Sequence, residues 1–204
     1  MLARSVRSDA ASEVSVVRVR MVRIALAVVA FAQVAFTADL PPVEAGSTAC
    51  SCIDWWTTEH LRVGQPNALD RKDRTTMRFE LTPYLAAGKV SRAVLCLSMD
   101  HYGITNANGF VVHRLVRDRE QIRPVDTLSQ DVEELGRFVI RAADASPAYR
   151  RIDVTEAVNG LLGTGHVQFV VRVRDATVEK HGNPGHRPEG VSIVREELKL
   201  EIEP

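Results

Sequence analysis

Hydrophobic and polar residues alternate along much of the chain, and this period of two is typical of β-strands with one buried face. In residues 75–81, a methionine, a phenylalanine and a leucine share one face, while the other face is polar. Residues 166–174 and 197–203 alternate in the same way. Each of these three stretches is therefore predicted to form a half-buried strand.

Further apolar stretches bring the prediction to some eight short strands. Residues 90–99 are apolar on both faces, as expected at the centre of a sandwich, and residues 109–116, 136–141 and 149–154 are rich in β-forming side chains. Turn residues separate these stretches. The pattern predicts an all-β fold, namely an antiparallel β-sandwich (jelly roll) with one short helix.

Two stretches have helical character. Residues 155–162 are predicted to form the short helix, with Asp153 or Thr155 as its N-cap and Gly163 closing it. Residues 126–135 are a second, less regular candidate. Long alternation of strands and helices, which would indicate a parallel sheet with a cofactor crevice, is missing from the sequence, and no cofactor is predicted.

The N-terminal residues follow the pattern of a secretory signal peptide. Arginines precede an apolar run over residues 24–36. Met21 lies closer to this run than Met1 does, and is therefore the better candidate for the first residue of the protein. The run is shorter than the ~20 apolar residues that span a bilayer, although an uncleaved anchor or a core helix is the alternative. We predict export to the cell surface or medium, no membrane span in the mature chain, and three parts: a leader over 1–38, a linker over 39–49 and a β-sandwich domain over 50–204.

The 204 residues contain 26 Lys+Arg and 26 Asp+Glu, but the charges are unevenly distributed. Residues 1–37 contain five arginines and two acidic residues, a net charge of +3, which leaves −3 for the rest of the chain. A mildly acidic domain argues against nucleic acid and anionic membrane surfaces as partners. It also disfavours polymers of uronic acid, unless arginines such as Arg172 and Arg174 gather on one face.

The three cysteines have to be interpreted for an oxidising compartment. A disulfide from Cys50 or Cys52 to Cys96 would fix the N-terminal arm to the domain, and a buried, free Cys96 that packs as a small apolar residue is the alternative. His181 and His186 flank a turn, but a surface loop explains them as well as a metal site does. No metal site is predicted.

Four segments carry a family resemblance: Leu61-Arg-Val-Gly64, Arg74-Thr-Thr-Met-Arg-Phe-Glu-Leu81, Val90-Ser-Arg-Ala-Val-Leu-Cys-Leu97 and Arg151-Ile-Asp-Val-Thr-Glu-Ala-Val158. In their order and spacing they resemble the motifs of the DNRLRE domain, which is classed among carbohydrate-binding modules of secreted and surface proteins in bacteria and archaea. The resemblance implies a jelly-roll β-sandwich and a non-catalytic role beside polysaccharide-active or adhesive domains.

Sugar-binding surfaces usually stack pyranose rings on exposed aromatic side chains, and polar groups bind the hydroxyls. The adjacent Trp55 and Trp56 would point to opposite faces of a strand, so that one of them could be exposed. Tyr102, Asn106 and Asn108 combine an aromatic ring with amides between two predicted strands. These five residues are the candidate carbohydrate-binding site, although a tryptophan closing the sandwich edge and an ordinary polar hairpin would explain them without a ligand.

Known catalytic motifs are missing from the sequence, including the Gly-x-Ser-x-Gly elbow and the His-Glu-x-x-His helix. The pairs Glu133-Glu134 and Glu196-Glu197 are adjacent residues, so their side chains are expected to diverge. We therefore predict that the protein is not an enzyme but an extracellular module that binds polysaccharide at the cell surface or in the matrix. The alternatives are a structural or adhesion module that contacts proteins and, more distantly, a small secreted hydrolase.

Overall fold

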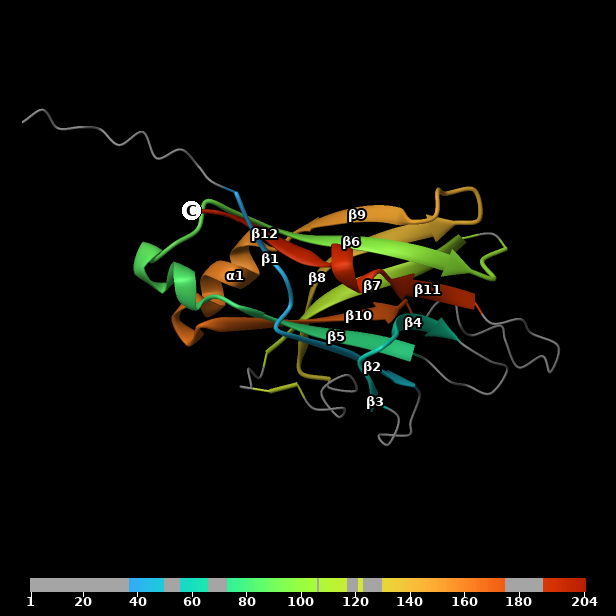
Figure 1. The fold of residues 1–204 in the computed structure, drawn as a ribbon, viewed down its shortest axis with the longest axis horizontal. Helices are drawn as coiled ribbons and strands as arrows, with labels where there is room; N and C mark the ends of the chain where they lie inside the picture. Colours follow the sequence, from blue (N-terminus) through green and yellow to red (C-terminus); the bar gives the residue numbers. More distant parts are fainter. Residues whose placement is uncertain are drawn as a thin grey trace, which may run out of the picture. The chain divides into compact units, whose positions relative to one another are not determined.

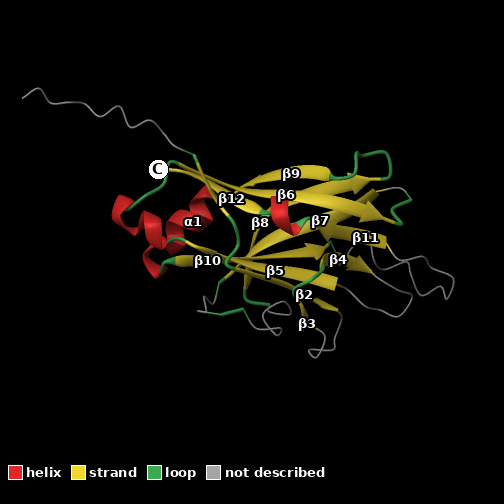
Figure 2. Ribbon diagram, viewed as in Figure 1, coloured by secondary structure: helices red, strands yellow, loops and turns green. Residues whose placement is uncertain are grey.

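Strands dominate the part of the chain that the computed structural model describes, which is residues 37–49, 56–65, 73–105, 107–116, 121–122, 130–174 and 189–204. These residues belong to one compact unit, Ala35–Pro204. The strands are β1 (Ala38–Leu40), β2 (Glu44–Ala49), β3 (Trp56–Thr57), β4 (Leu61–Gln65), β5 (Asp73–Glu80), β6 (Arg92–Tyr102), β7 (Ala107–Leu115), β8 (Val132–Arg141), β9 (Ala148–Asp153), β10 (His166–Val173), β11 (Glu189–Ile193) and β12 (Lys199–Glu203). The helical segments are α1 (Thr155–Leu161) and the 3-10 turns η1 (Thr82–Ala87), η3 (Leu162–Thr164) and η5 (Arg195–Glu197) (Figure 2).

The strands form one curled antiparallel sheet. Its hydrogen-bonded order is β1-β12-β6-β11-β4-β5-β10-β7-β8, while β9 joins the other edge of β6, and β2 joins β5. Strands β9, β6 and β12 therefore lie on one side of the core and β5 and β10 on the other, and the β4–β11 pair joins the two sides (Figure 1). This arrangement confirms the predicted all-β antiparallel fold with one short α-helix.

Strands β8 and β9 lie side by side but do not pair through backbone hydrogen bonds. Arg150 of β9 donates a hydrogen bond from Nη2 to the carbonyl of Val139 in β8, at 2.8 Å. A Cβ built on Gly136 of β8 would lie 3.0 Å from Ile152 of β9. The sheet is therefore closed here by side-chain packing and a side-chain hydrogen bond rather than by strand pairing.

The core consists of the inward-facing residues of both sides of the sheet. Phe79 of β5 contacts Phe169 of β10, with ring centroids 6.0 Å apart, and Phe110 of β7 stacks on Phe138 of β8 at 5.2 Å. All four rings are buried, as the alternation in residues 75–81 and 166–174 predicts for the first two. Since alternate strand residues point inward, those between them form the outer surfaces.

Helix α1 is attached to strand β6 and the residues before it. The Thr155 hydroxyl accepts a hydrogen bond from the Ala93 amide at 2.9 Å, and the Asn159 side chain bonds both the amide and the carbonyl of Val90, at 2.8 and 3.0 Å. The Asp153 carboxylate accepts a hydrogen bond from the Thr155 amide before the first turn. Past α1, η3 continues the helical path to Gly165, whose φ of 82° ends it, so the prediction that Gly163 closes the helix was wrong.

The predicted linker over residues 39–49 was also wrong, because these residues belong to the sheet. Strand β1 pairs with β12, and β2 pairs with β5. The small residues that suggested a flexible tether instead permit close packing: Ala45 is buried, and the hydroxyls of Ser47 and Thr75 lie 2.7 Å apart. The domain therefore begins before residue 50.

A third correction concerns residues 126–135, since Val132 begins strand β8 and does not belong to a helix. Nearly all of the predicted leader, residues 1–36, lies outside the described residues. Within the described ranges, helices are too short or too polar to cross a membrane.

Candidate functional site

The structure places only some of the predicted sugar-binding residues. Trp55 and Asn106 lie outside the described residues. Trp56 lies in β3 opposite Thr48 of β2, with a side chain that also falls outside the description. Tyr102 and Asn108 lie at facing ends of β6 and β7, and both approach the first two residues of β11.

Tyr102 is a packing residue. Its hydroxyl oxygen would lie 2.8 Å from a Cβ on Gly190, and it has no hydrogen-bond partner among the described residues. Burial raises the pKa of Tyr102 to about 12, with a further contribution from the nearby Asp73 carboxylate. Because the hydroxyl end is enclosed against β11, the ring does not form an open platform.

Asn108 supports the same junction. Its side-chain amide donates to the Glu189 carboxylate at 3.3 Å, and the Thr105 hydroxyl donates to the other oxygen of that carboxylate at 3.5 Å. These contacts hold the β6–β7 connection against β11. The structure thus brings Tyr102 and Asn108 together around Glu189 and Gly190.

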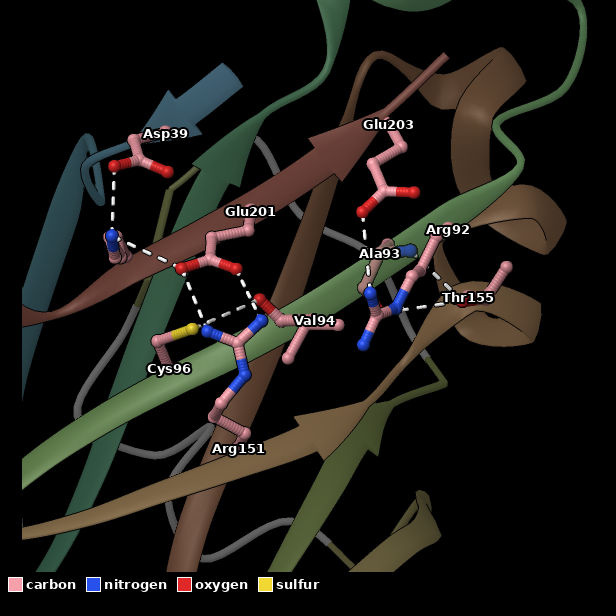
Figure 3. Close-up of polar contacts among 10 residues, drawn as sticks. Asp39, Arg92, Ala93, Val94, Cys96, Arg151, Thr155, Glu201 and Glu203 are labelled. Carbon is pink, nitrogen blue, oxygen red and sulfur yellow. Dashed lines mark hydrogen bonds and ion pairs between the residues drawn. The ribbon is translucent and has the colours of Figure 1, made fainter. Parts of the chain in front are cut away.

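Cys96 is a buried free thiol in the structure, as in the alternative to the disulfide, and the disulfide to Cys50 or Cys52 stays a prediction. Cys50 and Cys52 lie outside the described residues. Cys96 faces the outer side of β6 and lies beneath Glu201 and Arg151 of the flanking strands (Figure 3). Burial, together with the hydrogen bond and charge of Glu201, raises its pKa to about 11, so the thiol stays protonated at neutral pH.

A groove of about 390 Å³ on the outer face of β5, β10, β7 and β8 gathers arginines from different parts of the chain. We call it the arginine groove and define it by its charged and histidine side chains: Arg74, His113, Glu134, Arg137, Arg172 and Arg174. Four arginines thus face one glutamate. The sequence analysis disfavoured uronic-acid polymers unless arginines gather on one face of the domain. Arg172 and Arg174 do lie together on one face in this groove.

Strand register explains why these arginines meet. Val171 lies opposite Thr75, which brings Arg172 level with Arg74 on the next residue of each strand. On its other side Arg172 lies opposite Val111, which in turn lies opposite Arg137. Neighbouring strands are about 4.8 Å apart, so the row from Arg74 to Arg137 extends over roughly 14 Å.

The next row along the strands contains His113 and Glu134. A β-bulge between Val112 and His113 shifts the register, so that His113 lies opposite Glu134. Glu134 accepts two hydrogen bonds from Arg137, one of them from Nη2 at 2.9 Å. Among the described residues that line the groove, the one carboxylate is therefore already bound to one of the four arginines.

The positive charge of the groove affects the pKa of His113. Burial lowers the pKa of His113 most, and the charges of Arg172, Arg137 and Arg74 lower it further, against an opposing effect of Glu134. The imidazole is therefore neutral at pH 7. An anion bound beside it would raise this pKa, because it would stabilise the protonated ring.

Sequence reasoning singled out Arg172 and Arg174, and it named Glu134 only as one of two adjacent glutamates. His113 and Arg137 each occupy an outward position of a predicted strand, which alternation alone could have indicated, whereas Arg74 lies one residue before the predicted strand over 75–81. Their neighbourhood depends on pairing between strands that lie far apart in the sequence. The bulge at Leu135 adds a one-residue shift that alternation does not predict.

Comparisons with known proteins give no family for this chain. No family model matches it, and no curated protein matches it. Among solved structures, a recombinantly expressed latent aurone synthase, described as a polyphenol oxidase, matches with a TM-score of 0.36 and 14% sequence identity. The match covers 71% of this chain and 24% of that one, so this chain spans about a quarter of that structure's length. A similarity of this size carries no argument about function, and the resemblance to the DNRLRE domain stays a prediction.

Proposed function

We propose that the protein is a non-catalytic, exported module that binds acidic polysaccharide in the arginine groove. The observation that carries this proposal is the row of Arg74, Arg172 and Arg137 across adjacent strands of an outer sheet face. The signal-like N-terminus and the resemblance to the DNRLRE domain favour the same function. They also favour the cell surface or the extracellular matrix as its location.

Like charges on neighbouring strands destabilise a sheet. Arg74 and Arg172 lie level with each other on β5 and β10, and Glu134 is bonded to Arg137 on the far side of the groove. A bound carboxylate would reduce the repulsion between these two guanidinium groups and would be attracted to both.

Arginine suits this role because its planar guanidinium binds a carboxylate or sulfate through two parallel hydrogen bonds. Arg74, Arg172 and Arg174 each make at least one further interaction within the protein, which restrains their side chains before a ligand arrives. The lining of the groove comes from four strands. The groove can accept an internal segment of a polymer as well as a chain end.

The first experiment measures retention of the protein in native gels that contain polygalacturonate, dextran sulfate or uncharged dextran. We expect retention by one or both anionic polymers, and we expect it to weaken as salt rises because the groove is open to solvent. Loss of one charge-assisted hydrogen bond costs about 1.5–3 kcal/mol. The double variant R172Q/R137Q should therefore weaken binding by roughly tenfold or more.

A matched control is R92Q, because Arg92 is an exposed arginine of β6 that pairs with Glu203 away from the groove. R92Q should be retained like the unchanged protein. Equal weakening by R92Q and R172Q/R137Q would show that net charge alone is measured. Absence of retention on both anionic polymers, or equally strong retention on single-stranded DNA, would contradict the proposal.

A further inference from the structure

A second groove lies on the outer face of β9, β6 and β12, and its chemistry differs from that of the arginine groove. It has a volume of about 500 Å³, and its lining includes Asp39, Ser98, Tyr149, Arg151 and Glu201. Four carboxylates and three cationic side chains line it in total. An anionic ligand would therefore meet carboxylates here that the arginine groove does not present.

Tyr149 supplies an exposed aromatic ring in this groove. Ala148 and Ile152 of β9 point into the core, so Tyr149 between them points outward. Its side chain is 63% exposed, the largest value among the exposed large hydrophobic residues of the described ranges. It lies opposite Ser98 of β6, at the edge of the groove.

A single exposed aromatic residue is common on protein surfaces. What distinguishes Tyr149 is the polar network beside it. Arg151 binds the Glu201 carboxylate through two hydrogen bonds, at 3.0 and 2.5 Å (Figure 3). Lys199 binds Asp39 at 2.8 Å and lies 3.1 Å from Glu201, so that four side chains from three strands hold one another in place.

This network offers both donors and acceptors at a fixed position. Hydrogen bonds from Arg151, and then from Lys199, lower the pKa of Glu201 to about 2, so this carboxylate stays ionised over the whole physiological pH range and holds Arg151 in place. The side chain of Arg151 is 53% exposed, which leaves part of its guanidinium accessible to a ligand. Pyranose sugars combine an apolar C–H face with hydroxyls at the rim, and they need such a pairing of an aromatic ring with charged donors and acceptors.

We propose that this groove binds an uncharged pyranose unit of a glycan, with the sugar face on the Tyr149 ring and the hydroxyls on the exposed part of the Arg151 guanidinium, which Glu201 holds in position. This inference rests on the proposed function in one respect, namely that the protein binds glycans. It adds a second site and a second ligand class. Acidic and uncharged sugars then bind to different outer surfaces of the same domain.

The test uses native gels that contain dextran, galactomannan or xylan, and it compares the unchanged full chain with Y149A, Y149F and L85A. We expect retention on at least one of these polymers and a loss of at least tenfold in affinity for Y149A. Y149F keeps the ring and should retain binding. Leu85 is an exposed apolar residue of η1 outside both grooves, so L85A controls for the loss of exposed apolar surface.

Two results would overturn this inference: no retention on any of the three polymers, or equal retention of Y149A and the unchanged protein. R172Q/R137Q separates the two proposals, because it should keep its binding to the uncharged polymer. Loss of that binding in R172Q/R137Q would contradict a separate site. If polygalacturonate and dextran sulfate are not bound while Y149A alone loses the uncharged polymer, the proposed acidic ligand is wrong and the second site stands.

Discussion

Gly64 and Gly190 let the backbones of β4 and β11 approach more closely than side chains would permit. A Cβ on Gly64 would lie 2.4 Å from the carbonyl oxygen of Glu189, and one on Gly190 would lie 2.6 Å from that of Val63. Gly64 also has a φ of 152°, which residues with a side chain rarely adopt. The junction between the two sides of the sheet therefore depends on these two glycines.

The first prediction on stability concerns this contact. G64A should lower the free energy of unfolding by about 2 kcal/mol or more, because the methyl group would overlap backbone atoms that are held by the ladder. Urea denaturation followed by circular dichroism measures the change. G163A is the control, since no heavy atom lies within 4 Å of a Cβ there. A similar loss in both variants would contradict the steric explanation.

Single residues were predicted unevenly from the sequence. The motif ending at Gly64 was noticed through a family resemblance. The physical reason for a glycine at this position is the close approach of Gly190, which depends on strand register. Tyr102 was selected because it is aromatic, yet its hydroxyl is enclosed. Tyr149 was overlooked, although the apolar Ala148 and Ile152 around it would have placed it outward by alternation.

At the scale of elements, the ion pairs on the outer face tie β9 and β12 across β6. Arg151 of β9 and Glu201 of β12 lie on opposite sides of β6, and their two hydrogen bonds cover Cys96 (Figure 3). The Glu201 side chain is only 13% exposed. Its interactions are therefore less screened by water than those of a surface ion pair.

E201Q should lower the free energy of unfolding at pH 7 by roughly 1–3 kcal/mol, because hydrogen bonds to a buried charged group are lost. The folded-state pKa of Glu201 is about 2, below the ordinary value of 4.5, so ionised Glu201 stabilises the fold above pH 4.5. This contribution is lost as pH falls from about 4.5 to about 2. The free energies of unfolding of E201Q and the unchanged protein, measured by denaturation at each pH, should therefore become equal as the pH falls through this range.

E203Q is the control for this second prediction. Glu203 belongs to the same strand and pairs with Arg92, at a more exposed position. Its replacement should change the free energy of unfolding by less than about 0.5 kcal/mol at pH 7. A difference between E201Q and the unchanged protein that persists at pH 2 would contradict the assignment to the carboxylate charge.

Elements with unbroken alternation were predicted well, and the failures have identifiable causes. Residues 75–81 and 166–174 each form the core of a strand, β5 and β10. In β8, Leu135 is an extra residue at the register shift opposite Val112 and His113, so the alternation of inward and outward side chains is interrupted there. Strict alternation therefore does not identify the beginning of β8, which lies within the predicted helix over residues 126–135.

At the scale of the whole domain, β1 and β2 connect residues before position 50 to strands far along the chain. β1 covers the edge of β12, and β2 covers part of the edge of β5. A chain that begins at Cys50 would expose both edges and the core around Ala45. We expect its thermal midpoint to fall by roughly 10 °C or more, since several kcal/mol of packing and pairing are lost.

A chain that begins at Thr37 is the matched comparison, because it keeps β1 and β2. Its thermal midpoint, measured by differential scanning calorimetry, should equal that of the full chain within a few degrees. An unchanged midpoint for the chain that begins at Cys50 would restore the linker hypothesis for residues 39–49.

The arrangement of strands around the core was beyond prediction from periodicity. Arg74 and Arg172 lie 98 positions apart in the sequence and reach the same row only through the pairing of β5 with β10. Alternation shows which residues face outward but not which strands are neighbours. The two grooves are therefore properties of topology, whereas their individual side chains follow from local pattern.

The burial of Cys96 has a consequence for how this domain tolerates oxidants. A thiol with a pKa of about 11 contains almost no thiolate at neutral pH, and thiolate is the form that attacks disulfides and electrophiles. Peroxide and mixed disulfides should therefore leave Cys96 unmodified as long as β12 and β9 cover it. The rate at which an alkylating reagent modifies Cys96 therefore measures how often the sheet opens locally. This rate depends on how often β12 separates from β6.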